Sequence, residues 1–474
     1  MNNKKRVSYK IFYRDRENVA EAILYRDKSG EERPAFLIYS INPVYLKDGG
    51  FRVEYRLTLR DEVFEPPPPS KYPYQPYIFD SNDGLRTPDS EALFEVILSE
   101  FRRFVDVEDE IRILFTSAVM LSYVQELFET VPYIYLLGDN RSGKSNTLCL
   151  FAALCYRPLY GASIPSADLY TFLGSGEHIP TIIEEEIQGI ERDIEKSKIW
   201  KVGYKRGVKV PRIMIKPNGE RGIEYYPTYC FKIAAGENLI QLKGLAERFI
   251  NVNMVEGDPE SDEFTRGDYE AFGELRKHLL LWRMKTLIDS TWPPKLDIPW
   301  LKKRMKELYK PLLTVASVHP EHYKTLKRFV KERVEEKIRE RRDSFEGRLT
   351  IAAVELIGRS KTLEIPFEDI WVKLKMELNG LDHPNRPNQM ETELFGIITK
   401  QRVGRRLREV LGSKAVLKRA EDGVKRVHVF DPMKVLKIAK KIHVTDVNDV
   451  TDFQEYKEGL EFLKKRAGVR LSNA

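Results

Sequence analysis

The chain is poor in cysteine, with three among its 474 residues. Cys149, Cys155 and Cys230 form no C-x-x-C pair and have no histidine cluster nearby, which argues against a zinc site. Three cysteines are also too few for a disulfide framework. We therefore expect them to be small buried residues in a reducing compartment.

Long apolar runs and a strong excess of one charge are missing as well. The start, MNNKKRVSYK, lacks the apolar core of a signal peptide, and no stretch approaches the roughly 18 apolar residues of a membrane span. The chain has 79 Lys and Arg against 72 Asp and Glu, a net charge of +7, which permits a polyanionic partner without requiring one. These features predict a soluble cytoplasmic protein without a membrane partner.

The length favours about three domains with apolar content sufficient for real cores, and the order of apolar, turn and helical patterns divides the chain further. The proline run PPPP favours a stiff extended linker, although a strap packed on the next domain is the alternative. The predicted segments are a small β domain (1–64), a Pro-rich linker (65–86), an α/β core with preceding helices (87–257), a helical region (258–345), a basic domain (346–435) and a helical tail (436–474).

A phosphate-binding loop is the clearest motif. Residues 138–145, GDNRSGKS, fit G-x-x-x-x-G-K-S/T, whose backbone N–H groups surround phosphates while the lysine reaches the terminal phosphates and the hydroxyl binds Mg²⁺. Residues 133–137 read as a buried strand and residues 145–154 as a helix, so the flanks favour this loop over an ordinary glycine-rich turn. The sequence predicts ATP and Mg²⁺ as cofactors and a parallel α/β P-loop core. The predicted nucleotide-binding residues are Gly138, Asp139, Asn140, Arg141, Ser142, Gly143, Lys144, Ser145 and Asn146.

Carboxylates at the end of a second apolar run are the candidate catalytic groups. In residues 180–186, PTIIEEE, one carboxylate would hold Mg²⁺ through water and the next would orient or deprotonate the attacking water. Two isoleucines running into the acids favour Glu184 with Glu185, whereas a four-residue strand favours Glu185 with Glu186. Glu185 is in both pairs and ranks first. Ser145, Glu184 and Glu185 are the predicted metal ligands.

Two further polar residues follow later strands. The run YCFKIAAGEN ends in Asn238, whose side chain could touch the γ-phosphate and the lytic water. Ten residues on, Arg248 stands at the head of another strand. It could act in a neighbouring subunit as an arginine finger or in its own chain as a sensor, and a surface ion pair is the alternative.

These motifs in this order, with KSKIWKVGYKRGVKVPRIM between the acids and the Asn238 strand, resemble the AAA+-like ATPase core of superfamily 3 ring helicases and related archaeal plasmid and virus proteins. The resemblance covers roughly residues 132–255 and is strongest at the phosphate loop. It implies a hexameric ring and a basic hairpin that lines the pore and grips single-stranded DNA. The candidate DNA contacts that it implies are Lys205, Arg206, Lys209 and Arg212.

The residues of that segment are compatible with such a role. Aromatic and cationic side chains interleave between residues 200 and 212, as phosphate contacts with base stacking require. An Asn-Gly pair at residues 218–219 predicts a hairpin between PRIMI and IEYYP. A surface hairpin with solvated charges is the alternative.

A second nucleic-acid signal lies near the C-terminus. Residues 399–411 predict an amphipathic basic helix, and residues 414–430 two strands about an Asp-Gly turn, which is the winged-helix arrangement. From 399 to 431 there are ten Lys and Arg against four Asp and Glu. A winged helix that contacts protein is the alternative. The predicted duplex DNA contacts are Lys400, Arg402, Arg405, Arg406, Lys425 and Arg426.

Together these patterns predict an ATP-dependent DNA helicase or translocase, replicative or associated with a plasmid or virus. The alternative is an ATP-dependent DNA-binding regulator or defence ATPase that does not unwind DNA.

Overall fold

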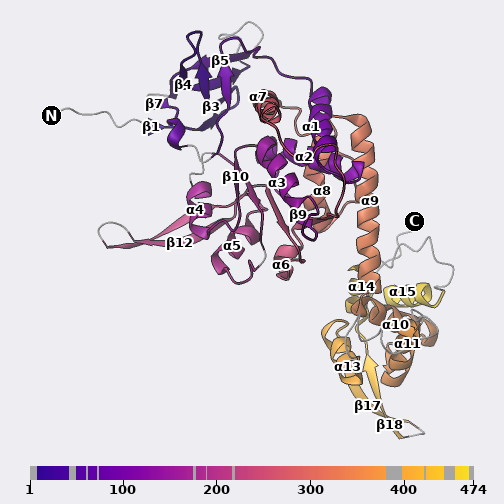
Figure 1. Cartoon of the computed structure of the whole chain (residues 1–474). Coiled ribbons are helices and arrows are strands. Elements are labelled where there is room, and N and C mark those ends of the chain that lie inside the picture. The colour runs from indigo at the N-terminus through magenta and orange to yellow at the C-terminus, as the bar shows by residue number, and fades with distance from the viewer. Residues whose placement is uncertain are drawn as a thin grey trace. The chain divides into compact units, whose positions relative to one another are not determined.

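The computed structural model describes residues 8–41, 50–59, 62–71, 74–174, 178–187, 189–215, 219–379, 398–420, 423–441 and 454–468. The chain forms two compact units, with the boundary between Val330 and Lys331. Helix α9 (Pro320–Asp343) begins in the first unit and ends in the second. Figure 1 gives the order of the elements.

The first unit begins with a β-sheet whose two long strands are buried over much of their length. Its antiparallel strands, in spatial order, are β2 (Phe12–Arg14), β3 (Asn18–Arg26), β4 (Glu32–Ser40) and β5 (Gly50–Glu54). A smaller sheet has the order β1 (Ser8–Tyr9), β7 (Glu62–Glu65), β6 (Leu57–Leu59). Strand β8 (Ile78–Asp80) pairs with β3 in parallel. The segment 65–86, expected to be a linker, thus adds a strand to the N-terminal sheet.

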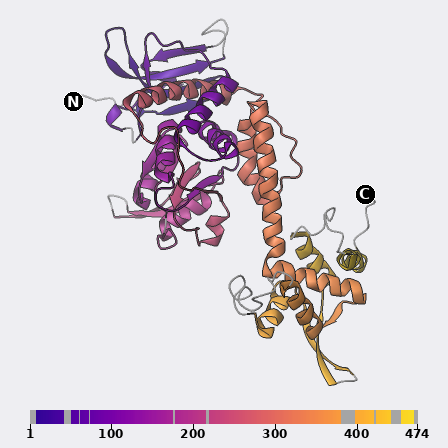
Figure 2. The same ribbon diagram turned by 45° about the vertical axis from the view of Figure 1, so that its right-hand side comes forward.

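A buried ion network joins this N-terminal sheet to the rest of the unit. The carboxylate of Glu21 on β3 is fully buried and accepts hydrogen bonds from Arg157 Nη2 at 2.6 Å and Arg283 Nε at 2.7 Å. Arg283 belongs to α7 (Arg266–Ile288), which packs against β3 beside the sheet (Figure 2). Removing one partner of such a buried pair costs about 3–5 kcal/mol. The sheet is therefore fixed to the unit by charge as well as by apolar packing.

Two helices precede the central sheet. Helix α1 (Ser90–Phe104) begins after Asp89, whose side chain accepts a hydrogen bond from the backbone N–H of Ala92 at 2.9 Å. This hydrogen bond satisfies an N–H group of the first turn that has no partner within the helix. Helix α2 (Asp109–Val124) is almost wholly buried, and the short 3₁₀ turn η2 (Gln125–Leu127) follows it.

A parallel five-stranded sheet forms the centre of the first unit. Its order is β10 (Pro158–Gly161), β11 (Thr181–Glu184), β14 (Lys232–Gly236), β9 (Tyr133–Leu137), β15 (Phe249–Asn253). Strand β9 has the predicted bounds, and α3 (Lys144–Leu154) follows it, one residue longer than predicted. The parallel α/β core expected from the alternating pattern is confirmed.

Side chains alternate across this sheet and define its two faces. Tyr133 and Tyr135 belong to an apolar cluster with residues of α4 (Ser166–Gly174) and α5 (Ile194–Val202). Helix α3 packs on β14, β11 and β10. The remaining elements of the unit are η1 (Pro69–Lys71), β12 (Lys209–Ile215), β13 (Arg221–Pro227), α6 (Lys243–Ala246) and α8 (Lys303–Ala316).

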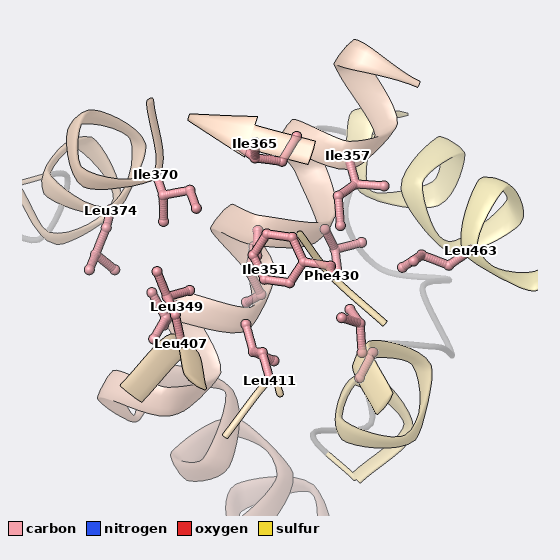
Figure 3. Close-up of a cluster of buried hydrophobic side chains, with 14 of the residues drawn as sticks. Leu349, Ile351, Ile357, Ile365, Ile370, Leu374, Leu407, Leu411, Phe430 and Leu463 are labelled. Atoms are coloured by element: carbon pink, nitrogen blue, oxygen red, sulfur yellow. The ribbon is translucent and has the colours of Figure 1, made fainter. Parts of the chain in front are cut away.

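The second unit is a small α+β domain. Its elements are α10 (Phe345–Ser360), β16 (Glu364–Pro366), α11 (Phe367–Asn379), α13 (Lys400–Glu409), β17 (Lys414–Ala420), β18 (Gly423–Val429), α14 (Pro432–Lys441) and α15 (Gln454–Arg466). The strands pair antiparallel in the order β16-β18-β17. Phe430 lies in the middle of the apolar core, among Ile351, Ile357 and Leu411 (Figure 3).

The helix α15, in the segment expected to be a tail, closes this core. Leu463 is buried in it beside the α10 side chains (Figure 3). Helices α10 and α15 touch at Gly358 and Gly459, where an added Cβ would lie 2.0 Å from the carbonyl oxygen of Glu455 and 2.1 Å from that of Val354. The two glycines thus permit the close helix contact. Among the described residues no helix is both long and apolar enough to span a membrane.

Candidate nucleotide-binding site and nucleic-acid surfaces

The loop between β9 and α3 needs glycine at two positions. Gly143 caps α3 with a φ of +80°, a backbone conformation that other residues rarely adopt. A Cβ on Gly138 would lie 2.3 Å from the carbonyl oxygen of Met254 and 2.6 Å from Ser142 Oγ. Both glycines of the motif therefore have a structural reason, and the loop turns at the carboxyl edge of the parallel sheet, where α/β proteins bind ligands.

The Lys144 side chain folds into the loop. Its ammonium donates hydrogen bonds to the carbonyl oxygens of Gly138 at 2.6 Å and Asp139 at 2.5 Å, and to Ser142 Oγ at 3.2 Å. Ser145 is exposed in the first turn of α3. The positive end of the helix dipole and the ammonium therefore act on the same small volume, an arrangement that binds phosphate.

A cavity of about 390 Å³ opens over this loop. Residues 140–147 form one wall, and residues from before α2 and after β15 form the other. Its size falls in the range of ligand pockets, and its second wall offers apolar surface for a base. Sequence reasoning missed this second wall because no local motif marks it. Its residues are Phe104, Val105, Asp106, Met254, Val255, Gly257, Pro259 and Asp262.

Glu184 is turned away from α3. On β11 its side chain points to the same face of the sheet as that of Ile182, which packs in the apolar cluster with α4 and α5. Its buried carboxylate pairs with Lys196 of α5 and accepts a hydrogen bond from the backbone N–H of Ile164 at 3.0 Å. Burial raises the pKa of Glu184 to about 7 despite the attraction of Lys196. This environment is that of a structural carboxyl group.

Glu185 is the next residue, and its side chain points to the opposite face of the sheet, on which α3 lies. Its carboxylate accepts a hydrogen bond from the Tyr160 hydroxyl, which lies 3.4 Å from Sγ of Cys149 on α3. Glu185 is partly exposed, and Glu186 after it is fully exposed. None of the three glutamates lines the 390 Å³ cavity. Of the three, the structure brings Glu185 to the side of the sheet that carries the phosphate-loop helix.

Asn238 and Arg248 lie at opposite edges of the sheet. Asn238 is exposed two residues beyond β14, where its carbonyl oxygen accepts a hydrogen bond from the Tyr135 hydroxyl at 2.6 Å. Arg248 directly precedes β15. The first residue of β15 pairs with the first residue of β9, whereas the phosphate loop follows the last residue of β9. About five residues of strand, roughly 16 Å, separate Arg248 from the loop. This register places the Arg248 backbone away from the phosphate loop of its own chain.

The Arg248 guanidinium has an aromatic neighbour at this amino edge. It lies 4.5 Å from the ring centroid of Tyr204, which a second guanidinium, that of Arg304, approaches at 4.9 Å. Arg248 is half-buried at this edge.

The predicted hairpin forms between β12 and β13, and its Asn-Gly turn begins at Asn218, outside the described residues. The exposed Arg212 side chain lies 4.8 Å from the Tyr170 ring, and Lys209 is also exposed. Lys205 and Arg206 precede the hairpin, next to residues 129–130. One face of the hairpin is unexpectedly apolar. Its residues are Ile213, Ile215, Ile223 and Tyr225, each 62–71% exposed.

The C-terminal hairpin β17–β18 presents cations instead. Lys425 and Arg426 are exposed, and Lys418 lies directly opposite Lys425 in the register. On α13 several basic side chains are neutralised within the unit: Lys400 pairs with Glu368 at 2.7 Å, and Arg405 with Glu409 at 3.2 Å. Lys418 of the hairpin likewise pairs with Glu364 of β16.

No protein-family model matches the sequence, and a search of curated proteins finds no relative. Among solved structures, the chain is similar to the apo A form of the NrS-1 C-terminal region, at 11% identity and a TM-score of 0.37, over 86% of this chain and 96% of that one. It is also similar to the active helicase Cch of SCCmec type IV, at 12% identity and a TM-score of 0.36, over 91% and 99%. Both TM-scores are below 0.5, so the fold assignment rests on the strand order and loop of this chain.

Proposed function

We propose that this chain is an ATP-dependent DNA helicase or translocase that works as a ring of identical subunits. One observation carries the proposal: a glycine-capped loop with Lys144 and Ser145 stands at the carboxyl edge of a parallel sheet, while Glu185, directly after β11, lies on the same face as the helix that follows the loop. Phosphoryl transfer needs this combination of phosphate clamp, metal ligand and water-orienting carboxylate.

Within this site Lys144 neutralises the terminal phosphates. The Ser145 hydroxyl and the Glu185 carboxylate are hard oxygen donors that fit Mg²⁺, which would draw charge from the phosphates when bound. Because Glu184 is buried against Lys196, Glu185 and Glu186 are the pair that remains for holding Mg²⁺ and orienting water. Asn238, two residues beyond the neighbouring strand β14, is the candidate contact to the γ-phosphate.

The position of Arg248 supports the ring. A guanidinium at the amino edge of the sheet does not reach the phosphate loop of its own chain. It can act as an arginine finger only on a triphosphate held by another copy. We infer that each site is completed by the Arg248 of a neighbour, with six copies as the expected number.

The second unit supports DNA as the partner. Among the described residues, α10, β16, α11, α13 and the hairpin follow one another in the order expected of a winged helix, in which α13 would enter the major groove and β17–β18 would touch the backbone. Lys425 and Arg426 are exposed on β18 and are the candidate contacts to the phosphate backbone. We assign duplex contacts to this unit and single-strand contacts to the basic residues 205–212.

The test is strand displacement with the full chain. We expect ATP hydrolysis that single-stranded DNA accelerates, unwinding of a forked duplex, and DNA-dependent assembly seen in electron micrographs. Hydrolysis that neither DNA nor assembly changes would contradict the motor. DNA-stimulated hydrolysis without displacement would instead favour the ATP-dependent regulator.

A further inference from the structure

A cluster of metal-binding side chains lies away from the nucleotide cavity, where α1 meets the start of α9. Glu95 Oε1 on α1 is 2.6 Å from Nε2 of His322 and 3.0 Å from Nε2 of His319. One ligand atom from each of the three residues lies within 4.8 Å of the others. Two imidazole nitrogens and one carboxylate oxygen thus converge on one point.

The surroundings hold the two imidazole rings in place. The His322 ring stacks on Phe94 with centroids 5.2 Å apart and planes at 21°, and the His319 side chain is only 16% exposed. The Glu95 side chain is 45% exposed, so the cluster opens to solvent on the carboxylate side. An ion bound there would have three fixed protein ligands and access to water.

The two histidines contact each other as well as Glu95. Their ring centroids lie 4.1 Å apart. The backbone nitrogen of His322 is 3.5 Å from Nδ1 of His319, too long a contact to fix the tautomer. Other charges are near: Arg102 Nη1 lies 3.9 Å from Glu95 Oε2, and Glu321 stands between the histidines in sequence.

We propose that Glu95, His319 and His322 bind one divalent transition-metal ion, with zinc as the best fit, and that the ion ties the start of α9 to α1. Two imidazoles and one carboxylate are a donor set of zinc sites, and the H-P-E-H spacing brings both rings to one side of the helix start. This proposal is independent of the nucleotide site.

Zinc was not expected from the sequence, because the cysteines have no histidine cluster nearby. Glu95 and His322 are 227 positions apart in the chain. No local spacing could have brought the carboxylate to the histidines, and only the packing of α9 on α1 does so.

The test is the metal content of the full chain purified with zinc and then passed over a weak chelating resin. We expect about one zinc ion per chain, and Co²⁺ substitution should give the visible absorption of a low-coordinate nitrogen and oxygen site. His322→Asn and Glu95→Gln should lose the ion. His278→Asn, at an exposed histidine of α7, is the matched control and should retain it.

Thermal unfolding makes the test independent of how well the variants fold. A strong chelator should lower the Tm of the wild-type chain and restored Zn²⁺ should raise it again, while the Tm of His322→Asn should respond to neither. A wild-type chain that retains no zinc, gives no Co²⁺ absorption beyond the aquo ion and shows no chelator effect would overturn the proposal. Equal zinc in wild type and both variants would show adventitious binding and overturn it equally.

Discussion

The two hairpins of the molecule have similar sequences and different surfaces. Both combine β-rich runs, basic residues and a turn with glycine, and both were predicted to contact DNA. In β12–β13 the cross-strand pair Ile213 and Ile223 is exposed on an apolar face. In β17–β18 the pair Lys418 and Lys425 is exposed instead. Composition alone does not tell these surfaces apart, because the alternation of side chains decides which residues share a face.

The alternation of side chains also separates two neighbouring glutamates at the end of β11. Glu184 and Glu185 are equivalent in sequence, but one is buried against Lys196 and the other faces the side of α3. A change of one position moves a carboxylate from the interior of a domain to the candidate catalytic side. The following predictions test both contrasts.

Loss of the phosphate clamp should have the largest effect. Lys144→Ala should lower the rate of ATP hydrolysis by about 10²–10³-fold, because a positive group at developing phosphate charge is removed. Duplex affinity, measured by fluorescence anisotropy without nucleotide, should stay unchanged if β17–β18 binds DNA by itself. Lys306→Ala, at an exposed lysine of α8, is the control.

Substitutions of Glu184 and Glu185 should differ in their effect on the rate of ATP hydrolysis. Glu185→Gln should slow hydrolysis by about 10²-fold or more while ATP still binds, since an oriented carboxylate contributes that much to proton transfer. Glu184→Gln should leave the single-turnover rate within a few-fold of wild type, because the Glu184 side chain lies on the side of the sheet away from α3, against Lys196. The reverse ranking would return the catalytic role to Glu184.

The hairpin cations should affect different properties of DNA binding. Lys425→Ala with Arg426→Ala should weaken duplex binding and reduce the slope of log affinity against log salt by about 2, one unit for each lost phosphate contact. Lys205→Ala with Arg206→Ala should reduce DNA-stimulated hydrolysis more than basal hydrolysis. If both pairs changed both properties equally, the contrast between the hairpins would fail.

A pH effect should distinguish the buried glutamate from the exposed ones. The pKa of Glu184 rises from its ordinary 4.5 to about 7 on folding, so between these values the folded chain binds more protons than the unfolded chain. Stability contributed by this group is therefore present at low pH and is lost as the pH rises toward 7, by at most about 1.4 kcal/mol per pH unit. The unfolding free energy, measured by denaturant titration, should fall less between pH 5 and pH 7 for Glu184→Gln than for wild type.

The apolar face of β12–β13 should give the smallest effect. Ile213→Ser with Ile223→Ser should change the unfolding free energy of the dilute chain by no more than about 0.5 kcal/mol, because both side chains are already exposed. Denaturant titration measures this directly. A larger loss that grows with protein concentration would mean that another copy covers this face.

Much of the fold was predictable because its signals are local. The apolar run of β9, the glycines at 138 and 143 and the turn signals of both hairpins each specify their structure within a few residues. The N-terminal sheet was less predictable, since β8 joins it from beyond the proline run. The burial of Glu21 among two arginines was not predictable at all, because Arg157 and Arg283 come from distant segments.

The sequence by itself determined the phosphate loop, the strands around it and the concentration of basic residues near the C-terminus, because periodicity and turn chemistry act over short stretches of chain. Only the tertiary structure decided which glutamate faces α3, at which edge of the sheet Arg248 lies, which wall closes the nucleotide cavity and which carboxylate meets His319 and His322. Those outcomes depend on strand order, register and helix packing, which bring together residues that are far apart in the chain.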